Sequence, residues 1–333
     1  MSKIKLGVVG VGHIGKNHAR IASELEGTEF TAIYDSNSAA ATEMARQFKA
    51  RAVGSLDEFA GLVDAATVAT PTPTHYEIGK FLLGQGKHLL IEKPIAENTA
   101  HAKELADLAR ERGLVLQVGH VERFNPVLGA LEKLLTRPRF IESHRLSPYP
   151  NRSTEIGVVL DLMIHDLEII LHLVRSPVKS VDAVGVPVLS RGEDIANARI
   201  RFENGCVANV TVSRISPEKM RKIRVFQENA YLSLDYQDQE GFIFRLARGE
   251  EEKSSLIKKL LSARESAIVS EFAGRKIVRE PVEIEKGEPL KRELQSFIDC
   301  CRKGAEPKVS GYQATAALEL AIEITRIIET QNA

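Results

Sequence analysis

The first 120 residues alternate short apolar runs with segments in which apolar residues recur every three or four positions. The second kind of segment, at about 14–25, 38–48, 73–84 and 99–112, predicts helices. Ser55 followed three residues later by Glu58 adds a capping box for one further short helix. Strands alternating with helices predict βαβ units, and hence a parallel sheet covered on both faces. The predicted strands are IKLGVVG, TEFTAIYD, DAATVAT, KHLLIE and LVLQVG.

After Arg123 the pattern changes. Helix-period segments at about 125–136 and 158–174 precede several strand-like runs that have no helices between them. Turn residues interrupt the alternation in RFENGCV and FQENAYL, which predicts antiparallel hairpins. Two more helices, near 288–303 and 311–329, end the sequence. The strand-like runs are SVDAVGVPVLS, NARIRFENGCVANVTVSRI, KIRVFQENAYLSLDY and EGFIFRL.

We therefore predict an α/β protein of two domains. Residues 1–121 form an N-terminal Rossmann domain with a parallel sheet. Residues 122–333 form a C-terminal α+β domain with a large, mostly antiparallel sheet. The stretch 247–275, rich in Lys, Glu and Ser, is predicted to be a loop or an amphipathic excursion.

Composition narrows the classes of partner. Lys plus Arg and Asp plus Glu number 45 each, so no net field recruits nucleic acid or anionic lipid. The longest apolar stretch, 156–174, contains charged residues, and residues 1–9 become polar too soon for a signal peptide. The three cysteines lack metal-ligand spacing. We expect a cytoplasmic protein with no metal and a small-molecule partner.

A glycine-rich turn follows the first predicted strand. Gly10, Gly12 and Gly15 have the G-x-G-x-x-G spacing of a dinucleotide-binding turn that opens a helix. The first glycine allows a tight turn, the second lets backbone approach a pyrophosphate, and the third allows close packing of helix on strand. Backbone amides around His13 and Ile14 would face the phosphates. The alternative is a plain strand-to-helix turn that binds nothing.

Asp35 ends the second predicted strand, 20 residues after Gly15. A carboxylate at this point accepts hydrogen bonds from both ribose hydroxyls but repels a 2′-phosphate. Ser36 and Asn37 provide no compensating arginine. The sequence therefore predicts NAD in preference to NADP as the cofactor.

Two later strands should bring polar residues to the edge of the sheet at which doubly wound folds bind ligands. One strand ends in Glu92, Lys93 and Pro94, and another ends in a turn that begins at Thr70 and Pro71 and ends at His75. These turns are candidates for lining the nicotinamide half of the site. For Glu92 and Lys93 the alternative is an ordinary ion pair at a strand end.

These motifs, in this order, resemble the Gfo/Idh/MocA oxidoreductase family. The resemblance covers nearly the whole chain. It implies a nicotinamide-dependent reaction at a carbon bearing a hydroxyl, usually on a sugar, a cyclitol or a nucleotide sugar. It also implies that Thr70, Pro71, His75, Glu92 and Lys93 contact the cofactor, with Lys93 between it and the substrate hydroxyl. The motifs are GVGHIG from Gly10, ATPTPTH from Ala69, EKP from Glu92 and DLMIH from Asp161.

The predicted helix at 158–174 carries one narrow polar stripe. Asp161, His165, Glu168 and His172 recur at steps of four, three and four among Val, Leu, Ile and Met. The distal pair, Glu168 and His172, is expected to meet water. The resemblance makes Asp161 and His165 catalytic and substrate-binding, with His165 as the base. Lys93 would then stabilise developing charge on oxygen, although Lys93 as the base remains an alternative.

The run VGHVERFNP, from Val118, resembles the subgroup of UDP-N-acetylglucosamine 3-dehydrogenases within this family. That subgroup oxidises the 3-hydroxyl of the sugar, and an aminotransferase then acts on the ketone. Arg123, Arg145 and Arg152 are candidates for the substrate pyrophosphate, with structural ion pairs as the alternative. Asn151 lies where the family often contacts substrate. His120 either contacts the nicotinamide or caps a strand.

Three functions therefore stay open: a nucleotide-sugar dehydrogenase, a dehydrogenase of a free sugar or inositol, and a non-catalytic NAD-binding sensor or regulator. The presence of Lys93, Asp161 and His165 together disfavours the third. The resemblance also implies that the C-terminal domain binds substrate and that its broad antiparallel sheet packs against a second copy, as family members commonly do, in a homodimer or homotetramer.

Overall fold

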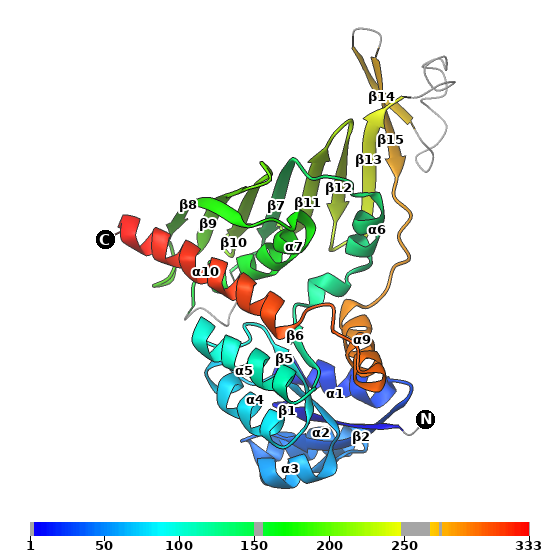
Figure 1. The fold of residues 1–333 in the computed structure, drawn as a ribbon, viewed down its shortest axis with the longest axis vertical. Helices are drawn as coiled ribbons and strands as arrows, with labels where there is room; N and C mark the ends of the chain where they lie inside the picture. The colour runs from blue at the N-terminus through cyan, green and yellow to red at the C-terminus, as the bar shows by residue number, and fades with distance from the viewer. Residues whose placement is uncertain (1–2, 150–155, 248–266, 273–274, 333) are drawn as a thin grey trace. The chain divides into compact units, whose positions relative to one another are not determined.

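The computed structural model describes residues 3–149, 156–247, 267–272 and 275–332 (Figure 1). The chain divides into two compact units. The first comprises Met1–Phe124 and Glu288–Glu319, and the second comprises Asn125–Gly287 and Leu320–Ala333. The first unit thus contains a C-terminal segment that the sequence pattern had placed in the second domain.

The described part of the first unit contains a six-stranded sheet in the order β3-β2-β1-β4-β5-β6, in which every neighbouring pair is parallel. This is the doubly wound order in which the first strand lies in the middle and dinucleotides bind at its carboxyl end. It confirms the predicted Rossmann domain. The strands are β1 (Ile4–Val9), β2 (Thr28–Tyr34), β3 (Arg51–Ala52), β4 (Ala65–Val68), β5 (His88–Glu92) and β6 (Leu116–Gly119).

Helices cover both faces of this sheet because its apolar residues alternate between the faces. Leu6 and Val8 of β1 are buried in a cluster with residues of α1, α2 and α9. Gly7 faces the other way, where a Cβ would lie 2.4 Å from the ring of Phe59 in α3. The helices are α1 (Gly15–Glu24), α2 (Ser38–Phe48), α3 (Leu56–Leu62), α4 (His75–Gly84), α5 (Thr99–Glu111) and α9 (Pro289–Lys303).

The second unit contains a nine-stranded sheet in its described residues, in the order β14-β15-β13-β12-β11-β7-β10-β9-β8. All neighbours are antiparallel except β7 and β10, which run parallel. The predicted hairpins at RFENGCV and FQENAYL are the β9–β10 and β11–β12 turns. The strands are β7 (Phe140–Leu146), β8 (Val178–Val186), β9 (Ile195–Phe202), β10 (Val207–Ser213), β11 (Met220–Gln227), β12 (Ala230–Asp235), β13 (Glu240–Leu246), β14 (Ala267–Phe272) and β15 (Arg275–Pro281).

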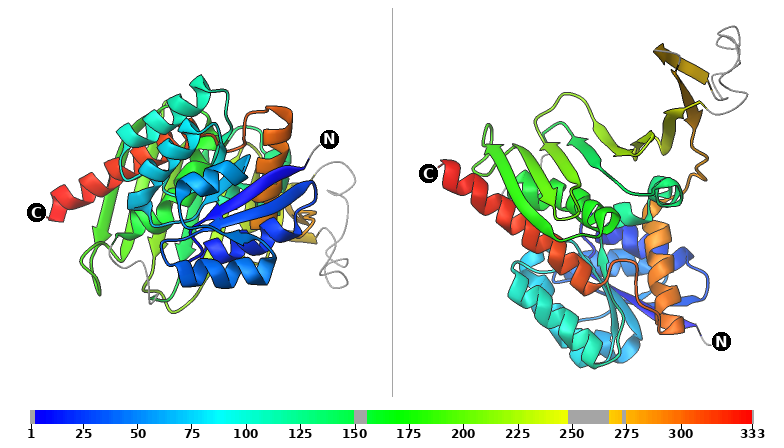
Figure 2. Two further views of the ribbon diagram at one scale, coloured as in Figure 1. Left: turned by 90° about the horizontal axis from the view of Figure 1, so that it is seen from below. Right: turned by 45° about the horizontal axis from the view of Figure 1, so that its top comes forward.

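Three helical elements lie against one face of this second sheet (Figures 1 and 2). They are α6 (Pro126–Leu134), the π-helical turn η3 (Val159–Met163) and α7 (Ile164–Val174), which continues η3. On the opposite face four aromatic rings, on β7, β11, β12 and β13, follow one another at centroid separations of 5.6, 5.0 and 4.4 Å. The last helix, α10 (Gly311–Asn332), contains the boundary between the two units. The four rings are those of Phe140, Phe226, Tyr231 and Phe244.

The structure differs from the sequence prediction at β7, which no pattern indicated although it lies in the middle of the sheet. Its buried positions are Ile141, Ser143 and Arg145, so two of the three are polar and the usual alternation is hidden. Part of the predicted loop at 247–275 also forms strand, namely β14 and the first residue of β15, whereas residues 248–266 lie outside the described part.

No helix of the described residues is both long and apolar enough to cross a membrane. Within the same ranges, no group of three or more His, Cys, Asp or Glu side chains is arranged to hold a metal ion.

The polar residues on the buried face of β7 attach α7 to the sheet. Nε of Arg145 donates to Oδ2 of Asp166 at 2.7 Å, and the hydroxyl of Ser143 donates to Oδ1 at 2.7 Å. Both members of the ion pair are at most 5% exposed. A buried carboxylate needs such partners because the interior does not solvate its charge.

Replacing Arg145 with methionine should therefore leave the carboxylate of Asp166 buried without its cation and cost about 3–5 kcal/mol of unfolding free energy. Arg224→Met is the matched control, because Arg224 pairs with Glu142 from a position that is 54% exposed and should cost no more than about 1 kcal/mol. Urea unfolding of both variants measures the difference. Equal losses would show that the Arg145–Asp166 pair does not hold α7.

Candidate active site

The glycine turn between β1 and α1 is shaped by two close approaches. Gly10 has φ +84°, and a Cβ there would lie 2.7 Å from Cγ2 of Thr70. A Cβ on Gly15 would lie 1.9 Å from the carbonyl oxygen of Gly10, so only glycine lets α1 start this close to the turn. At Gly12 the position of a Cβ has no described atom within 4 Å. The turn thus leaves open space beside its middle glycine.

Asp35 holds the same turn from the end of β2. Its Oδ2 accepts from the amide of Val11 at 2.7 Å, and its Oδ1 accepts from the amide of Asn37 at 2.8 Å. A carboxylate oxygen has a second lone pair, so these bonds leave acceptor capacity for ribose hydroxyls. Among the described residues no side chain caps the start of α1 at Ile14. An uncapped helix start beside open backbone suits a pyrophosphate.

Glu92 and Lys93 lie at the carboxyl end of β5, as predicted. Oε1 of Glu92 lies 3.0 Å from Nε2 of His18, a buried residue of α1, and Oε2 accepts the amide of Lys93 at 3.2 Å. A Cβ on Gly119 would come within 2.8 Å of the Glu92 carboxylate, so this strand neighbour must also be glycine. The described contacts of Glu92 fix the backbone from which Lys93 projects. The Lys93–Pro94 peptide bond is cis.

His75 joins the two turns at this edge of the sheet. Its Nδ1 lies 2.8 Å from the carbonyl oxygen of Pro94, and its Nε2 lies 2.8 Å from that of Thr70. Burial lowers the pKa of His75, although both carbonyls act in the opposite direction. The ring is therefore engaged with the backbone on both sides. Its predicted contact with the cofactor remains a prediction, as do those of Thr70 and Pro71.

His120 follows β6, next to the end of β5, because Gly119 pairs with Glu92 in the sheet register. It is 1% exposed. Burial, then the positive charges of Lys93 and Arg123, lower the pKa of His120 to about 3. The imidazole is neutral at neutral pH and lies in the field of the Lys93 ammonium. Arg123 is itself buried and donates to the carbonyl oxygen of Lys308 at 3.3 Å.

The predicted polar stripe lies on η3 and α7 of the second unit. Asp161 and His165 are partly exposed. The expectation that the distal pair meets water is wrong for Glu168, which is 2% exposed, and His172 pairs with Glu132 at 2.7 Å. The burial of the Glu168 carboxyl shows that this stripe packs against protein along part of its length.

Each unit thus contains part of the predicted site. The first unit brings together the glycine turn, the two strand-end turns, Lys93 and His120, and the second carries Asp161 and His165. Asn151 and Arg152 lie outside the described residues. Arg145 belongs to the buried pair with Asp166, so the structural alternative holds for it. The sequence prediction missed His18, whose only signal is an imidazole on the buried face of α1.

The family follows from matches to both units. Residues 4–120 match the model described as "Oxidoreductase family, NAD-binding Rossmann fold", and residues 132–233 match the "GFO/IDH/MocA C-terminal domain". The chain belongs to the Gfo/Idh/MocA oxidoreductase family. The predicted family, fold class and NAD cofactor are therefore confirmed, and the protein is an oxidoreductase whose first unit is an NAD-binding domain.

Among similar proteins in the Gfo/Idh/MocA family, UDP-N-acetylglucosamine 3-dehydrogenase from Acidithiobacillus ferrooxidans is 36% identical over 250 residues, which cover 75% of this chain and 79% of that protein. Its solved structure matches with a TM-score of 0.87 and 31% identity over 99% of both chains. scyllo-Inositol 2-dehydrogenase (NAD(+)) from Bacillus subtilis is 26% identical over 97% of this chain and 93% of its own.

The glycine turn fits the NAD expected from the family. Open space at Gly12 would admit the pyrophosphate, the amides at His13 and Ile14 begin the helix beside it, and Asp35 lies at the end of the neighbouring strand. When bound, NAD supplies a nicotinamide ring that accepts or donates hydride.

Alanine substitutions at Gly12 and Gly15 should affect different properties, namely NAD binding for Gly12 and folding for Gly15. Gly12→Ala should leave the thermal unfolding temperature of the NAD-free protein within about 2 °C and weaken NAD at least about 10-fold, because the added methyl occupies space needed only by the pyrophosphate. Gly15→Ala should lower the unfolding temperature itself, since its methyl overlaps the Gly10 carbonyl. Thermal scans and NAD titration measure both effects. Undiminished NAD affinity in Gly12→Ala would refute the phosphate assignment.

Because His120 is buried in its neutral form, the free energy of unfolding should fall in mild acid. Its pKa is about 3 in the folded protein and about 6.5 when unfolded, so the unfolded state binds more protons below about pH 6.5. The contribution of the neutral His120 imidazole to the free energy of unfolding is present above about pH 6.5 and is lost as the pH falls toward 3. Between about pH 7 and pH 5 the wild type should lose about 1–2 kcal/mol more than His120→Gln. Urea unfolding at both pH values tests this, with the exposed His13→Gln as a control that keeps the wild-type slope.

Proposed function

We propose that this protein oxidises the 3-hydroxyl of UDP-N-acetylglucosamine to the 3-keto sugar with NAD as hydride acceptor. The similarity that carries the proposal is the match to UDP-N-acetylglucosamine 3-dehydrogenase from Acidithiobacillus ferrooxidans, at 31% identity over 99% of both chains. The VGHVERFNP run, which resembles that subgroup, also supports the proposal.

The residues have separate tasks in this reaction. Oxidation of a secondary alcohol removes a hydride from carbon and a proton from oxygen. His165 is proposed to take the hydroxyl proton, because an imidazole can accept one near neutral pH. Lys93 would stabilise negative charge that develops on the oxygen, and Asp161 would bind an adjacent hydroxyl or orient the imidazole. Lys93 as the base is the alternative assignment.

Other contacts in the proposed site follow from the nucleotide portion of the substrate. A pyrophosphate calls for cationic or amide donors, and the proposal keeps His120, Arg123, Asn151 and Arg152 as substrate-binding candidates. The burial of Arg123 and its bond to the Lys308 carbonyl favour a structural role for that residue.

The proposal extends to partners and location. The open face of the second sheet, with its row of aromatic rings, is the surface through which we expect a homodimer or homotetramer to form. A ketone at C3 is a substrate for an aminotransferase, which would be the next enzyme. Free, non-disulfide Cys206, Cys300 and Cys301 agree with a reducing cytoplasm.

The second candidate function is oxidation of a free sugar or inositol, which the similarity to scyllo-inositol 2-dehydrogenase over 97% of this chain favours. An NAD-binding sensor without activity is the third. The presence of Lys93, Asp161 and His165 together disfavours that last function, because a sensor needs neither a base nor a group that stabilises charge on a substrate oxygen.

NADH formation decides among these functions. The purified protein with NAD should produce NADH on addition of UDP-N-acetylglucosamine, and N-acetylglucosamine or scyllo-inositol at the same concentration should produce little. Lys93→Ala should lower kcat by about 100-fold or more while NAD affinity is retained, because the glycine turn and Asp35 are unchanged. Equal rates with the free sugar or inositol would favour the second function, and no NADH with any of them the third.

A further inference from the structure

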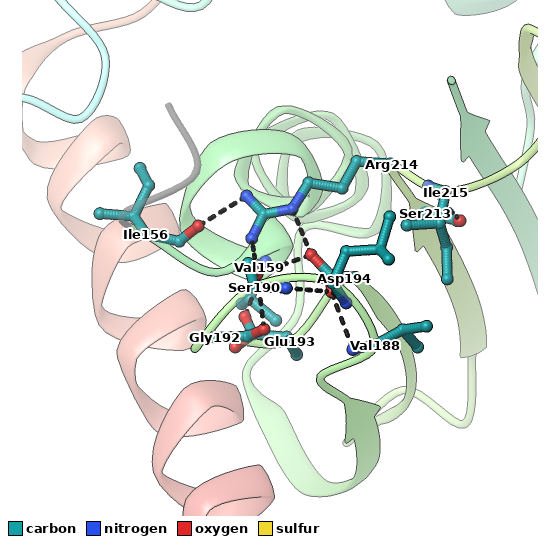
Figure 3. Close-up of polar contacts among 11 residues, drawn as sticks. Ile156, Val159, Val188, Ser190, Gly192, Glu193, Asp194, Ser213, Arg214 and Ile215 are labelled. Atoms are coloured by element: carbon teal, nitrogen blue, oxygen red, sulfur yellow. Dashed lines mark hydrogen bonds and ion pairs between the residues drawn. The ribbon is translucent and has the colours of Figure 1, made fainter. Parts of the chain in front are cut away.

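Arg214 and Asp194 form a buried ion pair in the second unit, outside the predicted site (Figure 3). Nε of Arg214 donates to Oδ1 of Asp194 at 2.7 Å, and both side chains are at most 1% exposed. Arg214 follows β10, and Asp194 immediately precedes β9. The pair therefore joins the end of β10 to the start of β9, its antiparallel neighbour.

The loop between β8 and β9 wraps around the Asp194 carboxylate. Oδ2 accepts the amides of Val188, Leu189 and Ser190 at 2.8, 2.5 and 2.9 Å, and Oδ1 accepts the hydroxyl of Ser190 at 2.7 Å. Burial acts to raise the pKa of Asp194, but these bonds and Arg214 outweigh it and hold the pKa below its ordinary value. The carboxylate thus stays charged and fixes the loop.

The fixed loop forms hydrogen bonds to the segment that leads into η3. The amide of Val158 donates to the carbonyl oxygen of Glu193 at 3.0 Å, and the amide of Val159 donates to its side-chain Oε1 at 3.1 Å. Nη1 of Arg214 donates to the carbonyl oxygen of Ile156 at 2.7 Å. A Cβ on Gly157 would lie 2.0 Å from the Glu193 carboxylate, so that carboxylate packs directly against the backbone.

This segment, residues 156–159, leads into the helical stretch that carries Asp161 and His165. The amide of Asp161 donates to the carbonyl oxygen of Gly157 at 3.2 Å, so the first turn is built on the residue against which Glu193 packs. That turn is π-helical, from Val159 to Met163, which is wider than an α-turn and changes the direction of the side chains that follow. Its starting point therefore determines where Asp161 points.

We propose that Glu193 is a positioning residue for the oxidation, holding the first turn of η3 so that Asp161 and His165 are presented in the reactive arrangement. Glu193 acts through the Val159 amide and the Gly157 backbone and does not itself touch the substrate. The inference rests on the proposed function, in which these two side chains carry the chemistry.

Glu193 is the residue to change, because truncating Arg214 would leave the Asp194 carboxylate buried without its cation and would impair folding. Glu193→Ala removes the acceptor for the Val159 amide. Glu193→Gln keeps an oxygen in the same place and should restore that bond. Gly157→Ala leaves Glu193 intact but displaces its carboxylate. Glu203→Ala, at an exposed carboxylate in the β9–β10 turn of the same unit, is the matched control.

With UDP-N-acetylglucosamine as substrate, Glu193→Ala and Gly157→Ala should each lower kcat roughly 10- to 100-fold, as expected for a small misplacement of reacting groups. NAD affinity should stay at the wild-type value, because the glycine turn belongs to the other unit. Glu193→Gln should recover most of the activity, and Glu203→Ala should not change it. Unchanged kcat in Glu193→Ala, or no recovery in Glu193→Gln, would overturn the positioning role.

Hydrogen exchange keeps the test independent of the sugar. Amides of the peptide that spans η3 should exchange faster in Glu193→Ala than in the wild type and return to the wild-type rate in Glu193→Gln. If the wild type does not oxidise UDP-N-acetylglucosamine, the proposed function fails by itself and the exchange rates still judge Glu193. Equal exchange in Glu193→Ala and the wild type would overturn the inference whatever the substrate.

Discussion

Three of the described elements that carry or position candidate chemistry are attached through a buried charged or polar group that must be paired. The interior does not solvate a charge, so a buried carboxylate stays in place only with its partners, and those partners are held in turn. Glu92 and His18 hold the end of β5 beneath Lys93. Asp166 and Arg145 hold α7 on its sheet, and Asp194 and Arg214 hold the loop that packs on the start of η3. Such contacts are directional, whereas apolar packing would tolerate small rotations of the same helices.

Histidines that look equivalent in the sequence differ in the structure in how far they are buried. His75 and His120 are buried, and their pKa values lie below the ordinary value, so both remain neutral across the physiological range. The two ring nitrogens of His75 each lie 2.8 Å from a backbone carbonyl oxygen, and the neutral ring donates its one N–H to either of them. His165 is partly exposed and lies on the helix with Asp161. The neutral imidazole of His120 lies in the field of the Lys93 ammonium and adds no second positive charge beside it.

The sequence was sufficient to predict the helices and strands in which apolar residues occupy the buried positions. Glycine spacing and β-branched runs predicted five of the six strands of the parallel sheet, all except the two-residue β3. Ser55 caps α3 through the amide of Glu58 as the capping box predicted. It was insufficient where burial is polar. β7 was missed because Ser143 and Arg145 occupy its buried face, and both make sense only with Asp166, more than 20 residues away. The π-helical turn of η3 and the contact of Glu193 with Gly157 likewise depend on partners distant in sequence.

The position of α9 has a consequence for biosynthesis. Leu294, Phe297 and Ile298 of this helix are fully buried against α1 and β1, although the chain passes through the second unit before reaching them. Three such side chains contribute about 5–9 kcal/mol of apolar burial, a quantity comparable to the whole stability of an ordinary domain. A nascent chain that has emerged only as far as residue 124 therefore exposes the apolar side chains of α1 and β1 that α9 covers in the folded protein. The core of the cofactor-binding unit is complete only after residues 289–303 have been synthesised, and until then its exposed apolar surface is prone to aggregation.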